Sequence, residues 1–341
     1  MTISAKPIIG VDLMGGDHPP HQLLSDILEH ISKKPLNAKI IFFCSIDHLT
    51  LIQSVLKSSL CITFLDYEIV PKQEYITLED HTLTALKTKK DSSLWQGVLD
   101  LKAKKVDALI SVGNTGALLA ICHFCLELLP KVHRPALLTK MPSMKNSITL
   151  LDVGANTTAT KEQLLQFSLI GSAYLKSLGN EHFKIGLLNI GTEEHKGTVE
   201  RKEALALIKS YHHQHPERIP HFIGNIEPQD VFLGNCELVV TDGFSGNIFL
   251  KSAEGTSQLI LKKLRTLNHP FISKELVSDL VQHLRPIFEH EVYPGALLAG
   301  VSGIVIKCHS YFDGRAIYHS IIHAIELHQG NFLEKLKKNL S

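Results

Sequence analysis

Polar residues in short glycine-containing turns follow apolar runs at several places in the chain. In the clearest case, Gly113-Asn114-Thr115-Gly116 separates the apolar run 107–112 from an apolar helical pattern. Glycine lets the backbone turn sharply and approach a ligand, and the first N–H groups of the following helix point outward. A helix start of this kind favours anions, phosphate above all. For any single turn, helix capping alone is the commoner explanation.

The same form recurs along the chain, and open α/β sheets bind ligands where their strands end. Several such turns together favour a shared anion-binding crevice over a set of independent helix caps. The polar and glycine residues in or beside these turns are the candidate site residues. They are Asp12, Gly15, Gly16, Asp17, Lys90, Ser92, Ser93, Asn114, Thr115, Gly116, Asn156, Asn189, Lys196, Asp242, Asn247, Lys307 and His309.

The motifs of several common enzyme classes are absent. No G-x-G-x-x-G follows an expected strand and no G-x-x-x-x-G-K-[ST] occurs, so neither classical dinucleotide binding nor a P-loop is indicated. The nearest approach to a nucleophile elbow, GFSG at 243–246, lacks the required spacing. A serine or cysteine acyl-enzyme is therefore not supported. In a transfer to phosphate, the oxyanion itself is the nucleophile, and the protein need only position reactants and stabilise charge.

The elements that must position these residues alternate between short apolar runs and helical patterns. This alternation predicts an α/β fold with a mostly parallel sheet and flanking helices. The expected strands are 8–12, 39–43, 62–65, 107–112, 136–139, 148–153, 184–190, 221–224, 238–241 and 303–307, and the expected helices include 22–32, 115–128, 161–178 and 312–327. No linker or repeat interrupts the pattern, so we expect one domain over 1–341.

The segment 251–290 departs from this alternation. It predicts two amphipathic helices, broken at Asn268-His269-Pro270, with no strand between them. Leucines and valines between 276 and 284 form one apolar stripe, and four basic residues gather near the break. A helical hairpin inserted in an α/β fold makes an oligomer contact, reaches a partner or packs on the core. The sequence leaves these three possibilities open.

Composition excludes several classes of protein. The chain has 341 residues, 44% of them hydrophobic and 20% charged, and a net charge of +1, which gives no reason to expect nucleic-acid binding. No apolar run reaches the roughly 18 residues of a membrane span, and the polar start is not that of a secretory signal, so we expect a cytoplasmic protein. Cys122 and Cys125 form a C-x-x-C without a second pair. Buried free thiols are therefore favoured over a metal or redox motif.

Long blocks of the sequence resemble the bacterial phosphate acyltransferase of phospholipid synthesis. They include IIGVDLMGGDHPP, KKDSS, ISVGNTGALLA, RPALLTKMPS, LLDVGAN, GLLNIGTEEHKGTVERKEA, IGNIEPQDVF, VVTDGFSGNIFLKSAEG and GVSGIVIKCHSYFDGRAI. Their order and spacing agree from about Ile8 to Leu327. The sequence departs from the family pattern at Tyr293-Pro294-Gly295-Ala296-Leu297, at Ser302-Gly303 and at Ser310-Tyr311-Phe312, which puts acyl-chain preference in question more than reaction class.

The resemblance implies an enzyme that moves a fatty acyl group from acyl carrier protein to inorganic phosphate. The acyl-phosphate would then feed glycerol-3-phosphate acylation, which makes a glycerol-3-phosphate acyltransferase a possible partner. The family's fold is similar to isocitrate and isopropylmalate dehydrogenases, the enzyme works as a homodimer, and some members associate peripherally with the membrane. No metal or organic cofactor is implied. The alternatives are a phosphotransacetylase-like enzyme that uses acyl-CoA and a membrane scaffold without catalysis.

The resemblance also implies roles for the candidate residues. Asn114, Thr115 and Gly116 would bind phosphate, helped by Lys90, Ser92 and Ser93, while Asp12, Gly15, Gly16 and Asp17 line the same crevice. Asn156, Asn189, Asp242, Asn247, Lys307 and His309 would orient the thioester or stabilise its oxyanion, with Lys196 nearby. Lys307 or His309 is expected to stabilise charge or deliver a proton. A purely structural role at a strand end is an equal alternative for both.

Overall fold

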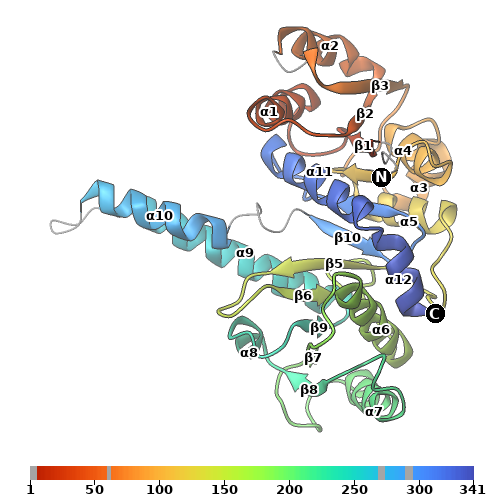
Figure 1. The fold of residues 1–341 in the computed structure, drawn as a ribbon, viewed down its shortest axis with the longest axis vertical. Coiled ribbons are helices and arrows are strands. Elements are labelled where there is room, and N and C mark those ends of the chain that lie inside the picture. The colour runs from red at the N-terminus through yellow and green to blue at the C-terminus, as the bar shows by residue number, and fades with distance from the viewer. Residues whose placement is uncertain (1–5, 60–62, 268–272, 289–294) are drawn as a thin grey trace, which may run out of the picture. The chain divides into compact units, whose positions relative to one another are not determined.

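The computed structural model describes residues 6–59, 63–267, 273–288 and 295–341 (Figure 1). The chain forms two compact units. The first comprises Met1–Pro135 and Pro294–Ser341, and the second comprises Ala136–Tyr293. Each unit contains its own set of strands with flanking helices.

The first unit contains a set of strands in the order β3-β2-β1-β4-β11-β10. These are β3 (Asp66–Lys72), β2 (Lys39–Ser45), β1 (Ile8–Asp12), β4 (Ala108–Ser111), β11 (Ile304–Lys307) and β10 (Ala296–Ala299). Neighbours pair in parallel except β10, which runs antiparallel to β11. The run IIFFCS of β2 is buried throughout, as expected for a parallel strand covered on both faces.

Helices cover the strands of the first unit. They are α1 (Pro20–Lys33), α2 (Leu49–Ser58), α3 (Thr82–Thr88), α4 (Ser93–Lys102), α5 (Thr115–Cys125), α11 (Gly314–Gln329) and α12 (Phe332–Leu340), with a short 3-10 turn at Ile46–His48. Helices α1 and α11 pack against each other, and α4 packs on α5. Helices α4 and α5 both begin where a polar loop meets the carboxyl ends of the strands.

The second unit has strands in the order β5-β6-β9-β7-β8. These are β5 (Ala136–Met141), β6 (Ile148–Leu151), β9 (Leu238–Val240), β7 (Ile185–Leu188) and β8 (Phe222–Ile226), parallel except for the β5–β6 pair. Its helices are α6 (Lys161–Ser177), α7 (Val199–Gln214), α8 (Pro228–Phe232), α9 (Gly243–Arg265) and α10 (Lys274–Phe288). A capping box at Thr160 and Gln163 starts α6.

The predicted α/β fold with a mostly parallel sheet and flanking helices is confirmed, with corrections at several elements; the helix expected at 115–128, for example, ends at Cys125. The expected strand 62–65 is wrong: Ile62 lies outside the described residues, Thr63–Leu65 is not a strand, and the strand there is Asp66–Lys72. Its half-exposed sequence DYEIVPK carries no continuous apolar run. Strand β10 was not expected at all. Helix α11 begins at Gly314 rather than 312, because Asp313 caps it by accepting the Ala316 N–H at 3.0 Å.

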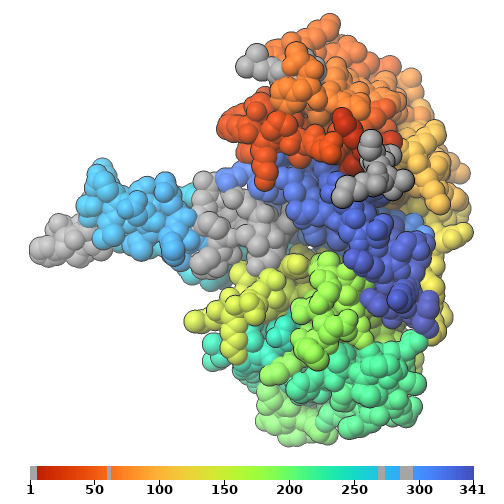
Figure 2. Space-filling view, viewed as in Figure 1, coloured from red at the N-terminus to blue at the C-terminus, as the bar shows by residue number. Residues whose placement is uncertain are grey.

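The predicted helical hairpin is present but starts earlier than expected. Helix α9 begins at Gly243 instead of residue 251, and α9 and α10 pack side by side and extend away from the strands of the second unit (Figures 1 and 2). The break at 268–270 lies outside the described residues. The predicted stripe divides in two. Val277 and Val281 are buried, whereas Leu276 and Leu280 remain 50% and 44% exposed.

Among the residues that the structure describes, every helix is too short or too polar to cross a bilayer.

Candidate active site

Three buried polar residues lie side by side at the carboxyl ends of neighbouring strands in the first unit. Asp12 ends β1, Ser111 ends β4 and Lys307 ends β11. The parallel pairing of β1 with β4 aligns Asp12 with Ser111, and the pairing of β4 with β11 aligns Lys307 with the same serine. All three are buried, Lys307 at 7% exposure. The sheet register therefore places a carboxyl, a hydroxyl and an ammonium group together.

Hydrogen bonds connect this cluster to the turns that follow the strands. The Ser111 hydroxyl donates to Asp12 Oδ2 at 3.0 Å and accepts the Gly113 N–H at 3.2 Å. Asp12 Oδ1 accepts the Met14 N–H at 3.3 Å. Lys307 Nζ donates to the carbonyl of Val112 at 3.3 Å and to that of Cys308. These contacts hold the ammonium group next to the strand end that leads into the turn 113–116.

Burial makes Asp12 unusually basic for a carboxylate. Desolvation raises its pKa to about 6, while the hydroxyls of Ser93 and Ser111, the Met14 amide and the charge of Lys307 act in the opposite direction. Ser93 is fully buried at the start of α4, where its hydroxyl lies close enough to the Asp12 carboxyl to lower its pKa.

The turn 113–116 is fixed by its asparagine. Asn114 caps α5 by accepting the Ala117 N–H at 3.0 Å, and its amide nitrogen donates to the carbonyls of Thr77, Leu78 and Asp80. The side chain is therefore committed to the cap and to the loop 77–80. What the turn offers to an anion is its backbone, where Thr115 and Gly116 are half-buried.

Two glycines permit the close packing of these turns. Gly15 has a φ of +75°, and a Cβ there would lie 2.4 Å from the Ile76 carbonyl oxygen. A Cβ on Gly116 would lie 2.5 Å from Thr82 Oγ1. Neither position accommodates a side chain without displacement of a neighbour. The loop after β1, the loop before α3 and the start of α5 are thus packed against one another.

The remaining candidates of the first unit lie around this cluster. Ser92 is the buried N-cap of α4, and Gly16 packs against Val112. The Ser310 hydroxyl donates to Asp17 Oδ2 at 2.9 Å, which ties the loop after β1 to the loop after β11. His309 is half-buried and its ring stacks on Tyr311, with centroids 5.1 Å apart. Lys90 is exposed.

The neighbouring lysine has a different role from Lys90. Lys89 Nζ donates to Asp80 Oδ2 at 2.6 Å and to the Tyr75 carbonyl at 3.1 Å. Lys89 therefore supports the same loop 77–80 that Asn114 holds. Of the two adjacent lysines, Lys90 is the more exposed to a solvent-borne anion.

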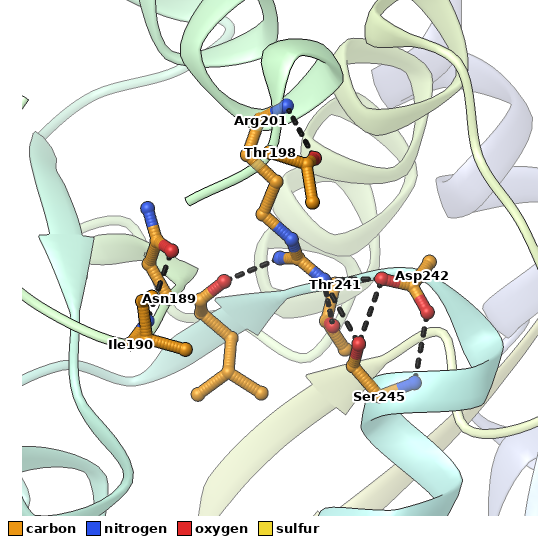
Figure 3. A network of polar contacts seen from close by, with 8 residues as sticks. Asn189, Ile190, Thr198, Arg201, Thr241, Asp242 and Ser245 are labelled. Carbon is orange, nitrogen blue, oxygen red and sulfur yellow. Dashed lines mark hydrogen bonds and ion pairs between the residues drawn. The ribbon is translucent and has the colours of Figure 1, made fainter. Parts of the chain in front are cut away.

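The candidates of the second unit surround an arginine that the sequence did not single out. Arg201, in the first turn of α7, forms an ion pair with Asp242, the N-cap of α9 (Figure 3). The guanidinium also donates to Thr241 Oγ1 and Ser245 Oγ, each at 3.2 Å, and to the Leu188 carbonyl. One side chain thus joins the end of β7, the end of β9 and the start of α9.

A second buried aspartate organises the loop after β6. Asp152 accepts the N–H groups of Gly154 at 3.0 Å and Ala155 at 2.9 Å, and the side-chain amide of Asn156 at 2.9 Å. Burial raises the pKa of Asp152 above its ordinary value, although the hydrogen bonds from Ala155 and Asn156 act in the opposite direction. Asn156 is held by Asp152, while Asn247, on α9, lies beside Gly154.

The loop after β7 contains the last two candidates. Asn189 is buried; its amide nitrogen donates to the Lys196 carbonyl at 3.2 Å, and its amide oxygen accepts the Ile190 N–H at 2.9 Å. Figure 3 shows Asn189 and Ile190 together beside the Arg201 network. Lys196 is half-buried and contributes its backbone to this contact.

The structure thus brings the candidates together in two groups, one in each unit. Asp12, Ser93 and Lys307 share one cluster of the first unit, and Asp242, Asn247 and Asn156 surround the start of α9 in the second. Ser111, Asp152 and Arg201 were missed. Ser111 and Asp152 stand inside blocks that the sequence analysis quoted, one residue from the end of an apolar run. Arg201 also lies in a quoted block, but it stands inside a helix and not at the end of an apolar run, so the strand-end pattern does not mark it.

The described cysteines match the sequence analysis. Cys44, Cys122, Cys125, Cys236 and Cys308 are buried free thiols, as predicted, and Cys61 lies outside the described residues. Burial raises the pKa of Cys122 far above its ordinary value, which opposes thiolate chemistry in the C-x-x-C. Within residues 6–59, 63–267, 273–288 and 295–341, no group of three potential ligands could hold a metal ion.

Comparison with known proteins identifies similar chains and folds. Residues 8–335 match the model of a family described as "Fatty acid synthesis protein". The chain is 38% identical over 336 residues to a phosphate acyltransferase from Chlamydia abortus, covering 98% of this chain and 99% of that protein. Two solved structures have similar folds. One is a phosphotransacetylase from Streptococcus pyogenes, with a TM-score of 0.61 and 15% sequence identity, covering 95% of this chain and 94% of that one. The other is 4-hydroxythreonine-4-phosphate dehydrogenase from Klebsiella pneumoniae, with a TM-score of 0.56 and 11% sequence identity, covering 95% of this chain and 100% of that one.

Proposed function

Because the chain belongs to the family of fatty acid synthesis proteins and is an acyltransferase, we propose that it transfers a fatty acyl group from acyl carrier protein to inorganic phosphate. The observation that carries this proposal is the buried cluster of Asp12, Ser111 and Lys307 beside the starts of α4 and α5. A buried ammonium group and outward-pointing helix N–H groups favour an oxyanion. The acyl-phosphate product would serve phospholipid synthesis.

The reaction requires one bond to form and one to break. A phosphate oxygen attacks the thioester carbonyl carbon, the new C–O bond forms, and the C–S bond breaks to release the carrier thiolate. That thiolate takes up a proton and leaves as the free thiol. No covalent enzyme intermediate is needed, because phosphate is the nucleophile. The protein lowers the barrier by holding the reactants in position and by stabilising negative charge.

The first unit supplies the proposed phosphate site. The backbone N–H groups of Thr115 and Gly116, with the hydroxyls of Ser92 and Ser93 and the charge of Lys90, would hold the anion. Asp12, Gly15, Gly16 and Asp17 line that site. Lys307 or His309 would stabilise the oxyanion or supply the proton. In the second unit, Asn156, Asn189, Lys196, Asp242 and Asn247 are assigned to orienting the thioester.

An acyl-CoA:phosphate acyltransferase is the second candidate function. The fold similarity to a phosphotransacetylase favours it, since that enzyme class uses phosphate on an α/β scaffold of this kind. The donor thioester separates the two candidates.

The test is detection of acyl-phosphate made by the purified full-length chain. Matched acyl carrier protein and CoA thioesters of the same fatty acid are incubated with phosphate, and acyl-phosphate is trapped with hydroxylamine. We expect phosphate-dependent product, formed faster from the carrier protein. Faster reaction from acyl-CoA would favour the phosphotransacetylase-like activity. No product from either donor would overturn the enzymatic proposal.

The partners and location follow from the same proposal. We infer that the chain works as a homodimer in the cytoplasm and that it contacts the membrane surface peripherally through the α9–α10 hairpin. Half-exposed Leu276 and Leu280 on α10 support the hairpin as a contact surface. A glycerol-3-phosphate acyltransferase would consume the product. Neither a cofactor nor a nucleic acid enters this scheme.

A further inference from the structure

Arg201 joins two strand ends of the second unit to the first turn of α9. Its guanidinium contacts the Leu188 carbonyl, Thr241 Oγ1 and Ser245 Oγ and forms the ion pair with Asp242 (Figure 3). The side chain is 11% exposed. A planar fork with several donors is suited to such a junction, whereas a lysine ammonium cannot reach all of these acceptors at once.

Both oxygens of the Asp242 carboxylate take part in this network. Oδ1 accepts the Ser245 N–H at 2.8 Å, and Oδ2 accepts the Ser245 hydroxyl at 2.9 Å and faces Arg201. A general base needs a lone pair aimed at the proton it removes. Here both oxygens are directed at the protein's own helix start and at a guanidinium. The contacts are those of a helix cap fixed by an ion pair.

The first turn of α9 in turn determines where Asn247 lies. A Cβ on Gly246 would lie 1.9 Å from the Asp152 carbonyl oxygen, so the helix passes in direct contact with the loop after β6. One residue further on, the Asn247 side chain packs beside Gly154, with its Cγ 3.7 Å from the position of a Cβ there. A shift of this turn would therefore move the Asn247 amide.

We propose that Arg201 and Asp242 are a positioning pair that fixes Asn247, and that Asp242 takes no proton from the substrate. The inference rests on the proposed function, in which Asn247 orients the thioester. It assigns a role to Arg201, and it gives Asp242 an indirect role, through Asn247, in place of its own contact with the thioester. Misplacement of an orienting group by a small distance lowers turnover more than it changes phosphate binding.

The test compares four variants of the full-length chain: Asp242→Asn, Arg201→Lys, Arg201→Met and the double variant Arg201→Met/Asp242→Asn. For each, kcat, KM for phosphate and the pH profile of acyl-phosphate formation are measured. Asparagine caps helices as well as aspartate, so Asp242→Asn should lose less than about tenfold in kcat and keep the shape of the pH profile. Loss of a general base would cost about 10²–10⁴-fold and remove one limb of the profile.

The arginine variants test the positioning role. Arg201→Met should lower kcat by about tenfold or more with KM for phosphate changed less than about twofold, and Arg201→Lys should recover only part of the loss. The double variant should be no worse than the poorer single variant, because both substitutions break the same contact. Lys161→Met is the matched control. It removes an exposed ion pair between Lys161 of α6 and Glu203 of α7, the helix that carries Arg201, and the kcat of this variant should be unchanged.

Two results would overturn the inference. One is a loss of about 10²–10⁴-fold in the kcat of Asp242→Asn, together with the loss of one limb of its pH profile. The other is an Arg201→Met variant that melts at a lower temperature yet keeps full kcat while folded. Hydrogen exchange at 243–250 separates this inference from the proposed function. Exchange there should rise in Arg201→Met and not in Lys161→Met, even if the wild-type chain makes no acyl-phosphate; unchanged exchange would also overturn the inference.

Discussion

Asp12 and Lys307 end the two strands that flank β4, and both lie in register with Ser111 between them. A buried carboxyl and a buried ammonium group therefore share one end of the first unit's sheet, where Lys307 helps to lower the pKa of Asp12. Burying charge is costly unless the groups are hydrogen-bonded and balanced by opposite charge. Because burying these charged groups is costly, their presence together is the strongest structural indication that the candidate active site of this unit lies here.

Lys307→Met should abolish most of the transfer activity. The substitution keeps an unbranched apolar stem of similar length but removes the charge that would stabilise the developing oxyanion. Loss of one such group costs about 10²–10³-fold in kcat in other enzymes. The measurement is the rate of acyl-phosphate formation, with Lys105→Met, which removes an exposed lysine of the same unit, as control. Equal rates for Lys307→Met and wild type would remove Lys307 from the reaction.

The raised pKa of Asp12 predicts a specific pH dependence of stability. Because its pKa rises from 3.8 to about 6 on folding, the folded protein binds this proton more tightly than the unfolded chain. The contribution of Asp12 to the free energy of unfolding is therefore greatest below the unfolded pKa and is lost as the pH rises through the folded one. The shift of about 2 units corresponds to about 3 kcal/mol as an upper estimate.

Asp12→Asn removes this titration and keeps an acceptor for Ser111. We expect the variant to gain stability relative to the wild type as the pH rises between the two pKa values. Urea unfolding of both proteins at several pH values across that window provides the measurement. A constant difference between the two proteins over the window would mean that Asp12 titrates normally in the fold.

The sequence was sufficient for the fold class and for most of the strands, because buried parallel strands are short apolar runs. It failed where a strand is half-exposed, as in β3, and where a side-chain cap determines a helix start, as Asp313 does in α11. In the site, the turns carry glycine and asparagine and are recognisable. Register is not: the alignment of Asp12, Ser111 and Lys307 depends on pairing between residues about 100 and 200 positions apart.

Arg201 shows a second limit of the same kind. Its position in the first turn of α7 gives it the pattern of an ordinary solvent-exposed helix residue. Only the tertiary structure reveals that its guanidinium reaches Leu188 and Asp242 across two strand ends. The hydrophobic stripe of the hairpin was similarly visible, but the packing of α10 on α9 was needed to divide it into buried valines and exposed leucines.

Asn114→Ala should weaken both the fold and the reaction. The variant loses the cap of α5 and leaves the carbonyls of the loop 77–80 without their donor, for a combined loss of about 1–3 kcal/mol in the free energy of unfolding. Asn114→Ser is the matched variant, since serine restores the cap but not the amide donor. We expect it to recover only the part of the stability that the cap supplies, measured by urea unfolding, while kcat/KM for phosphate stays low. Wild-type kcat/KM in the serine variant would show that the loop 77–80 plays no part in catalysis.

Leu280→Glu should weaken the contact that we propose for the exposed side of the α9–α10 hairpin, either with a second copy of the chain or with the membrane surface. Leu280 lies on the outer, exposed side of α10, while Val277 and Val281 are buried in the hairpin, so a charge at position 280 leaves the helix pair intact and acts on the contact it makes. Leu178→Glu is a matched control, because Leu178 is equally exposed at 44% and lies outside the hairpin. In sedimentation velocity, the sedimentation coefficient of Leu280→Glu should move toward that of a monomer, and that of Leu178→Glu should equal the wild-type value. A second arm measures liposome binding, because an apolar surface that meets lipid rather than a second copy would lose liposome binding without a change in sedimentation. If both variants match the wild type in both arms, the hairpin surface makes no contact that depends on Leu280.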